Sequence, residues 1–186
     1  MLTSAQLPVL PAPPYRLRQF TIEDLPLVRE ASGDPYIPLI STVPADFTEA
    51  AGLAFIARQN DRVDSGAGYP FAIARVEDDV AVGHVGVWPR PSDRERASIG
   101  YWVAPSGRGH RAGSCAVRAL SEWAFRYLGI QRLEAYVEPW NVASQRTVEA
   151  VGYVREGTMR SWQVVGIHRK DMYMYSLLAD DSTLNP

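Results

Sequence analysis

The sequence has one cysteine, three histidines and no long apolar run. A single cysteine, Cys115, cannot form an internal disulfide, which fits a reducing cytosol. His84, His110 and His168 lie far apart and lack the spacing of metal ligands, so we predict no bound metal. No apolar run approaches a membrane-spanning length, and the N-terminus lacks the basic start and apolar core of a signal peptide. We therefore expect a cytoplasmic protein with no membrane partner.

An excess of charge of either sign is also missing. The net charge is −2, which gives no support for a nucleic-acid partner. With 186 residues, 46% hydrophobic and 22% charged, the chain can build one globular core. Prolines gather in residues 1–14, for which we predict a flexible tail. A single domain is expected over residues 15–180, followed by a C-terminal tail at 181–186.

Apolar periodicity predicts helices that interrupt a series of strands. Helices are expected at 21–31, 48–58 and 141–151, with another that ends before Gly129; strands are expected at 15–20, 71–76, 80–88, 98–103, 132–138, 153–162 and 170–178. Loops are expected at 33–44, 60–68 and 90–96. This order predicts an α+β domain with a mostly antiparallel sheet flanked by helices.

One stretch points to a ligand. The apolar run 99–104 stops at Pro105, and a short basic loop rich in glycine then opens into a helix. Amide groups at a helix start lack intrahelical partners and favour anions, so a phosphate or pyrophosphate would fit here. Glycines allow the ligand to approach the backbone closely, and basic side chains add donors. The same sequence also fits a plain surface turn before a packed helix.

A second stretch begins where the strand at 132–138 ends. Asn141 and Ser144 lie one helical turn apart at the start of a helix, so both side chains can point toward one cleft. Taken alone, the same two residues are better explained by simple capping of that helix.

Together the two stretches resemble the GNAT acetyltransferases, and within them the branch that acetylates the N-termini of ribosomal proteins. The matching segments are GYWVAPSGRGHRAGSCAVRAL, RLEAYVEPWNVASQRTVEAVGY, EGTMR with DMYMYSLL, and LRQFTIEDLPLV near the N-terminus. The resemblance covers nearly all of the chain beyond the proline-rich tail.

This resemblance implies a mixed sheet that splays open between the strand ending at Val103 and the strand ending at Glu138, with acetyl-CoA in the opening. The pantetheine arm would pair with the backbone at Trp102 and Val103. Asn141 would bond a pantetheine amide, and Ser144 would approach the sulfur and protonate the leaving thiolate. The pyrophosphate would sit on the loop formed by Arg108, Gly109, His110, Arg111, Ala112, Gly113 and Ser114.

The sequence departs from the family pattern at three positions. Arg111 replaces the middle glycine of the loop, while Ser98 and Gln163 stand where related enzymes often carry acidic residues. Glu138 is then the best remaining candidate for a general base, directly or through water. It could also be an ordinary solvated carboxylate at a strand end.

The sequence therefore favours an acetyl-CoA-dependent N-acetyltransferase that acts, by direct attack on the thioester, on the N-terminal α-amine of a protein or peptide. Two alternatives stay open: an N-acetyltransferase of a small-molecule amine, and a non-catalytic module that binds acyl-CoA. The expected partners are acetyl-CoA and an amine acceptor, and the chain is expected to be a monomer or a homodimer.

Overall fold

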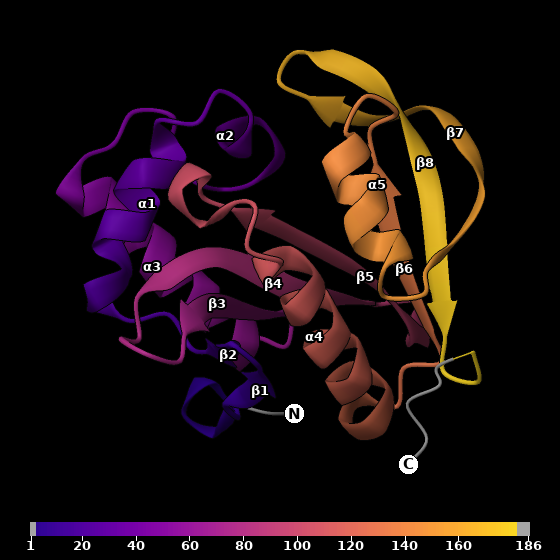
Figure 1. The fold of residues 1–186 in the computed structure, drawn as a ribbon, viewed down its shortest axis with the longest axis horizontal. Helices are drawn as coiled ribbons and strands as arrows, with labels where there is room; N and C mark the ends of the chain where they lie inside the picture. Colours follow the sequence, from indigo (N-terminus) through magenta and orange to yellow (C-terminus); the bar gives the residue numbers. More distant parts are fainter. Residues whose placement is uncertain (1–2, 182–186) are drawn as a thin grey trace.

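The computed structural model describes residues 3–181, which form one open sheet of eight strands with helices on both faces (Figure 1). The strands are β1 (Leu10–Ala12), β2 (Tyr15–Arg18), β3 (Tyr69–Arg75), β4 (Ala81–Arg90), β5 (Asp93–Val103), β6 (Arg132–Val137), β7 (Val154–Val165) and β8 (His168–Leu178). The α-helices are α1 (Leu25–Ser32), α2 (Ile37–Ile40), α3 (Glu49–Asp64), α4 (Ala112–Leu128) and α5 (Val142–Glu149). The strand order is β1-β2-β3-β4-β5-β6-β8-β7, which confirms the predicted α+β fold with a mostly antiparallel sheet.

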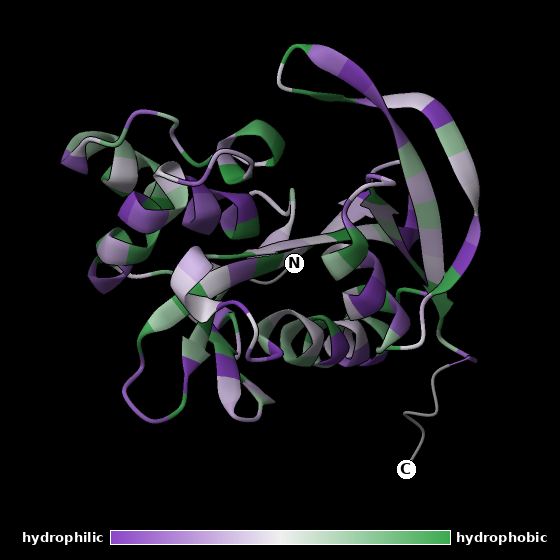
Figure 2. Cartoon of the chain, turned by 45° about the horizontal axis from the view of Figure 1, so that its top comes forward, coloured by the Kyte–Doolittle hydropathy of each residue, from purple (hydrophilic) through white to green (hydrophobic). Residues whose placement is uncertain are grey.

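The two faces of the sheet carry separate apolar clusters, because successive side chains of a strand point to opposite faces. Phe71 and Ile73 of β3 pack in the cluster that contains α4, whereas Ala72 between them packs in the cluster of α1 and α3. In Figure 2 these helices carry both polar and apolar residues, as expected for helices with one side against the sheet. The helices therefore cover both sides of the central strands.

The sheet splits between β5 and β6. These two strands are parallel and pair only at Arg96 with Arg132, Ala97 with Leu133 and Ser98 with Glu134. Beyond this short contact β5 continues beside β4, and β6 continues beside β8, so the strands diverge (Figure 1). The connection through α4 makes the parallel pairing possible. The opening lies where the sequence analysis expects it.

Several boundaries differ from the sequence predictions. The flexible tail predicted at 1–14 is wrong for Leu10–Ala12, which pairs with β2 and buries Leu10 and Ala12. The loop predicted at 33–44 contains α2, and α3 continues to Asp64 instead of ending near residue 58. The loop predicted at 90–96 is mostly strand, because β4 and β5 form a long hairpin. Of the predicted C-terminal tail, residues 182–186 lie outside the described part.

Candidate active site

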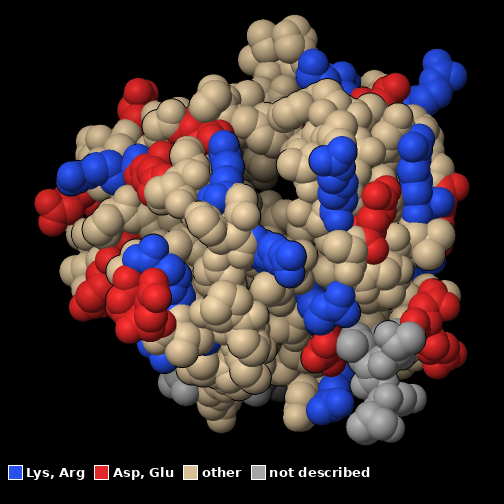
Figure 3. Space-filling view, in the orientation of Figure 1, with Lys and Arg blue, Asp and Glu red and all other residues tan. Residues whose placement is uncertain are grey.

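A cleft of about 450 Å³ occupies the split between β5 and β6 and extends toward α2 and α3. Its lining joins residues that are far apart in the sequence, among them Tyr36, Gln59, Arg62, His84, Trp88, Ser98, Tyr101, Trp102, Glu138, Asn141, Ser144 and Gln163. The space-filling view shows a recess near the centre of one face, with basic side chains at its edge (Figure 3). The predicted catalytic residues Ser144 and Glu138 thus line one cavity.

The loop that opens into α4 has the backbone of an anion site. Gly109 and Arg111 both have positive φ, at +83° and +62°, and turn the chain into the helix. The first amide to make a bond to this turn is that of Cys115, which donates to the Arg111 carbonyl at 3.0 Å. In the described structure no hydrogen bond is found for the amides of residues 109–114. These amides are therefore free to take an anionic ligand.

The Arg108 side chain was predicted to bind the anion, but its guanidinium is bonded to groups of the protein. Its guanidinium donates to the Val103 carbonyl at 3.0 Å and to Asp34 at 2.6 Å. Burial opposes the charge of Asp34, but the amides of Ile37 and Tyr36 and the Arg108 guanidinium outweigh it and lower the pKa of Asp34. Arg108 thus ties the loop to the start of α2.

Hydrogen bonds and packing hold the rest of the loop in place. Tyr15 donates its hydroxyl proton to the His110 carbonyl at 3.0 Å, and Ala112 is buried. The Ser114 hydroxyl donates to the Arg111 carbonyl at 3.0 Å. A Cβ on Gly113 would lie 3.3 Å from Thr147 and 3.4 Å from Tyr101. Gly113 therefore permits the close approach of α4 to α5.

The exposed edge of β5 offers Val103 rather than Trp102. Ala104 donates its amide proton to Val82 at 2.9 Å, and peptide groups alternate in direction along a strand. The N–H and C=O of Val103 consequently face the split, while those of Trp102, which is paired with His84, face β4. The register thus contradicts the expected backbone pairing at Trp102, and its indole lies buried in the cleft wall.

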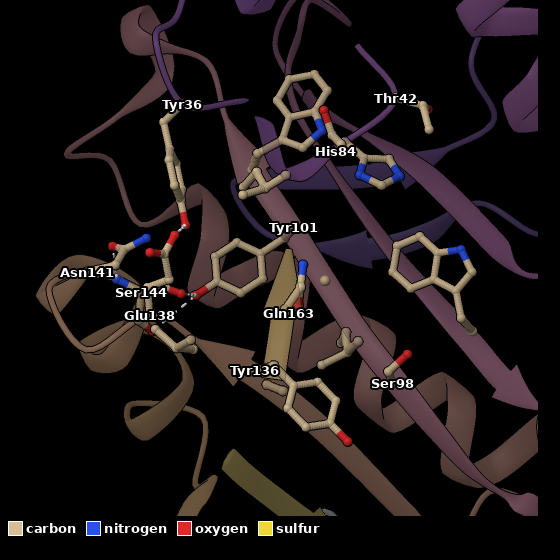
Figure 4. Close-up of a pocket in the computed structure, with 18 of the residues that line it drawn as sticks. Tyr36, Thr42, His84, Ser98, Tyr101, Tyr136, Glu138, Asn141, Ser144 and Gln163 are labelled. Carbon is tan, nitrogen blue, oxygen red and sulfur yellow. Dashed lines mark hydrogen bonds between the residues drawn. The ribbon is translucent and has the colours of Figure 1, made fainter. Parts of the chain in front are cut away.

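Ser144 and Asn141 begin α5, as the sequence predicts. The Asn141 side-chain oxygen accepts the Ser144 amide proton at 3.1 Å, so the capping interpretation of Asn141 is confirmed. The Ser144 hydroxyl lies 2.8 Å from the Tyr101 hydroxyl, and either can donate (Figure 4). Burial raises the pKa of Tyr101, which keeps this hydroxyl protonated. The two hydroxyls form a pair of proton donors in the split.

Glu138, directly after β6, is buried and not a solvated carboxylate. Its side chain is 4% exposed, and Tyr36 donates its hydroxyl proton to Glu138 Oε1 at 2.6 Å (Figure 4). Burial and the neighbouring carboxylate raise the pKa of Tyr36, so it remains a donor. Of the described residues that line the cleft, Glu138 is the one carboxylate, and Ser98 and Gln163 line the same cleft.

Sequence reasoning missed Tyr36, Tyr101 and His84. Tyr36 lies 102 positions before Glu138 in the sequence, in a segment expected to be a loop. Tyr101 belongs to a run that reads as strand core, and His84 is one isolated histidine. No local pattern marks them, because their role depends on the pairing of distant elements.

Within residues 3–181 no group of three or more histidine, cysteine or acidic side chains is arranged to hold a metal ion. No described helix combines the length and apolarity needed to cross a membrane.

Comparisons with known proteins agree with this geometry. The acetyltransferase (GNAT) domain family matches residues 15–154. An uncharacterized N-acetyltransferase of Bacillus licheniformis, p20, is 28% identical over 162 residues, which cover 87% of this chain and 91% of that protein.

Two solved structures have a similar fold. RimJ of Mycobacterium smegmatis, in complex with a CoA disulfide, gives a TM-score of 0.79 at 21% identity and covers 95% of this chain and 88% of its own. RimL, described as a ribosomal L7/L12 α-N-protein acetyltransferase in complex with coenzyme A, gives a TM-score of 0.75 at 18% identity. The match covers 94% of this chain and 100% of the RimL chain.

Proposed function

The chain belongs to the GNAT acetyltransferase family, and on that basis we propose that this N-acetyltransferase moves an acetyl group from acetyl-CoA to the N-terminal α-amine of a protein or peptide. One observation carries the proposal: where β5 and β6 diverge, a hydroxyl pair and a buried carboxylate line one cleft. A structural neighbour that is named a ribosomal α-N-protein acetyltransferase and binds coenzyme A supports it.

Three parts of the chain would bind the coenzyme. The free amides of residues 109–114 would receive the pyrophosphate at the start of α4. The pantetheine arm would lie along the edge of β5 at Val103, whose carbonyl accepts from Arg108 and keeps a second lone pair for an amide of the arm. The Asn141 oxygen already caps α5, so its NH₂ group is the part left to bond a pantetheine carbonyl.

The residues of the cleft supply what direct transfer needs. The Val103 amide would stabilise the negative charge on the thioester oxygen when the amine attacks. The pair formed by Ser144 and Tyr101 would protonate the departing thiolate, whose conjugate thiol has a pKa of about 8.5. Glu138 would take the proton that the amine loses, directly or through water, while Tyr36 holds the carboxylate in place.

An α-amine suits a site with one carboxylate. With a pKa of about 7.8 it is roughly one-third neutral at pH 7.5, whereas a lysine side chain with a pKa of about 10.4 is only about 0.1% neutral. Two exposed tryptophans, Trp140 and Trp162, pack against the cleft residues Tyr36 and Tyr136, and such apolar surface suits a peptide better than a small polar amine. The cytosol remains the expected location.

The decisive experiment compares two peptides. One has a free N-terminus and no lysine; the other has a blocked N-terminus and a free lysine. We expect kcat/KM for the first to be at least about 100-fold higher and to rise with pH until it levels near pH 7.5–8. Efficient acetylation of the blocked peptide, or coenzyme binding without transfer to any amine, contradicts the proposal.

The coenzyme site has its own test. Ser114→Glu places a carboxylate among the amides at the start of α4, and we expect the dissociation constant for coenzyme A to rise more than about tenfold, because two like charges then meet. Ser114→Gln has the same size without the charge and should bind nearly as the parent does. Calorimetry measures both, and equal affinities for the two variants contradict the site.

A further inference from the structure

The end of the cleft opposite Ser144 contains buried polar groups without a partner. His84 and Trp102 are each 6% exposed, and both line the cleft. In the described structure, neither ring nitrogen of His84 nor the indole nitrogen of Trp102 has a hydrogen-bond partner. Leaving a buried polar group without a partner is energetically costly, so such groups usually serve a ligand or ordered water.

Aromatic rings surround the His84 imidazole and determine its charge. Its centroid lies 5.7 Å from that of Trp102, 5.8 Å from Phe20 and 5.9 Å from Trp88. Burial lowers the pKa of His84 to about 3, so the ring is neutral at physiological pH. A neutral imidazole offers one N–H donor and one nitrogen acceptor. Together with the Trp102 indole this makes two donors and one acceptor.

The charges near this end are unfavourable for a cation. Arg62 lines the cleft here and donates to Gln59 at 2.7 Å, whereas Glu138 lies at the other end beside Tyr36 (Figure 4). The ligand group that fits is therefore neutral or negative and carries an oxygen.

The location separates this end of the cleft from the proposed coenzyme site. Trp102 packs in the apolar cluster of α1 and α3, while the loop at 109–114 leads into α4 on the other face of the sheet. A coenzyme that approaches over α4 and an acceptor that approaches from the α3 side would meet in the split. His84 and Trp102 then lie on the acceptor side.

We propose that His84 and Trp102 form a specificity subsite that receives an uncharged, hydroxyl-bearing substituent next to the acceptor amine. The Trp102 indole donates to the hydroxyl oxygen, and the hydroxyl donates to the unprotonated nitrogen of His84. A hydroxyl satisfies both groups at once, whereas a methyl group in the same place leaves both unpaired. This inference rests on the proposed function, because it assigns the acceptor to this side of the cleft.

The kinetic test uses two peptides that differ only in their first residue, threonine or valine, which have the same shape. We expect kcat/KM to favour threonine at least about tenfold. His84→Phe and Trp102→Phe keep an aromatic ring and remove the nitrogens, and should bring the ratio close to one. Trp123→Phe, in the α4 cluster away from the cleft, is the matched control and should keep the ratio. A ratio near one in the parent enzyme, or an unchanged ratio in both variants, overturns the subsite.

A binding test decides the subsite even if no peptide is acetylated. The indole N–H resonance of Trp102, identified by its loss in Trp102→Phe, should move when threonine amide is added and stay in place with valine amide. Equal response to the two amides, or none to either, overturns the proposal. Failure of transfer together with this selective shift would reject the proposed function alone.

Discussion

Glu134, in β6, and Glu138, directly after that strand, are four residues apart and both buried, yet their surroundings differ completely. Glu134 lies at the closed end of the split and bonds four side chains: Arg90, Arg96, Arg132 and Tyr136. Glu138 lies at the open end, and the side chain that bonds its carboxylate is that of Tyr36.

These surroundings suit Glu134 to a structural role and Glu138 to the proposed chemistry. Burial alone would raise the pKa of Glu134, but the bonds from Arg132, Arg96, Tyr136 and Arg90 lower it to about 2. That carboxylate is charged at physiological pH, and its partners hold β5 and β6 together where their pairing ends. Among residues 3–181 no ion pair is formed by Glu138, and its side chain lines the cleft. The ion pairs of Glu134 hold the strands together at the closed end, and the open end carries the side chains proposed for catalysis.

The variant with the largest expected effect is Glu134→Gln, which tests the structural role of Glu134. The variant removes the counter-charge that the partly exposed Arg90, Arg96 and Arg132 share, although Arg132 keeps Glu156, and we expect the free energy of unfolding to fall by about 2 kcal/mol. Chemical denaturation measures it. Glu138→Gln, directly after the same strand, is the matched control and should change stability by less than about 1 kcal/mol. Equal losses in the two variants would contradict the structural role of Glu134.

The pH dependence of stability is a second test of the role of Glu134. Because the folded-state pKa of Glu134 lies below its unfolded value of about 4.3, its contribution is complete above that pH and is lost as the pH falls toward about 2. Unfolding measured between pH 2 and 6 should show this loss in the parent protein and a flatter profile in Glu134→Gln.

At the open end, the test is activity. Glu138→Gln should lower kcat/KM for an α-amine about tenfold to hundredfold without abolishing it, because solvent can also accept the proton. Tyr36→Phe should lower the rate in the parent enzyme and have almost no further effect in Glu138→Gln, because Tyr36 acts through that carboxylate. Full additivity of the two changes in steady-state kinetics would separate Tyr36 from Glu138.

The two ends were not equally predictable from sequence. The loop at 108–114, the strand before it and the start of α5 follow from local patterns of glycine, charge and periodicity, and the structure confirms those elements. Two further positions came from the family resemblance and not from a local pattern: Ser98 and Gln163, which both line the cleft. Local sequence therefore predicts the backbone of the site well.

Contacts between distant segments could not be predicted in this way. Glu134 and Arg90 are 44 residues apart, and Tyr36 and Glu138 are 102 residues apart. Such pairs depend on strand register and on the short α2, which a run with three prolines hides. The N-terminal strand was missed for a similar reason, because proline at a sheet edge is tolerated but resembles a tail.

Ser144 gives a smaller test of the open end. Because the Tyr101 hydroxyl lies 2.8 Å away, Ser144→Ala should lower kcat only about threefold to tenfold, and the dissociation constant for coenzyme A should hardly change. Adding Tyr101→Phe removes the second donor and should lower kcat further. Presteady-state kinetics with a peptide acceptor measures both variants. An unchanged kcat in the double variant would limit Ser144 to starting α5.

The smallest expected effect concerns Arg111, whose φ of +62° lies in the left-handed region that disfavours side chains. Arg111→Gly removes this strain, about 1–2 kcal/mol, but glycine costs part of it in chain entropy, so we expect a net gain of about 0.5–1 kcal/mol in stability. The loss of its charge should weaken coenzyme binding about tenfold, as expected for a charge-assisted phosphate contact. Arg111→Ala keeps the strain and removes the charge, and should therefore weaken binding without the gain in stability. Thermal unfolding measures the stability of the two variants, and calorimetry measures their affinity for coenzyme A. A stability gain in both variants would mean that the left-handed backbone of residue 111 does not lower the stability of the protein.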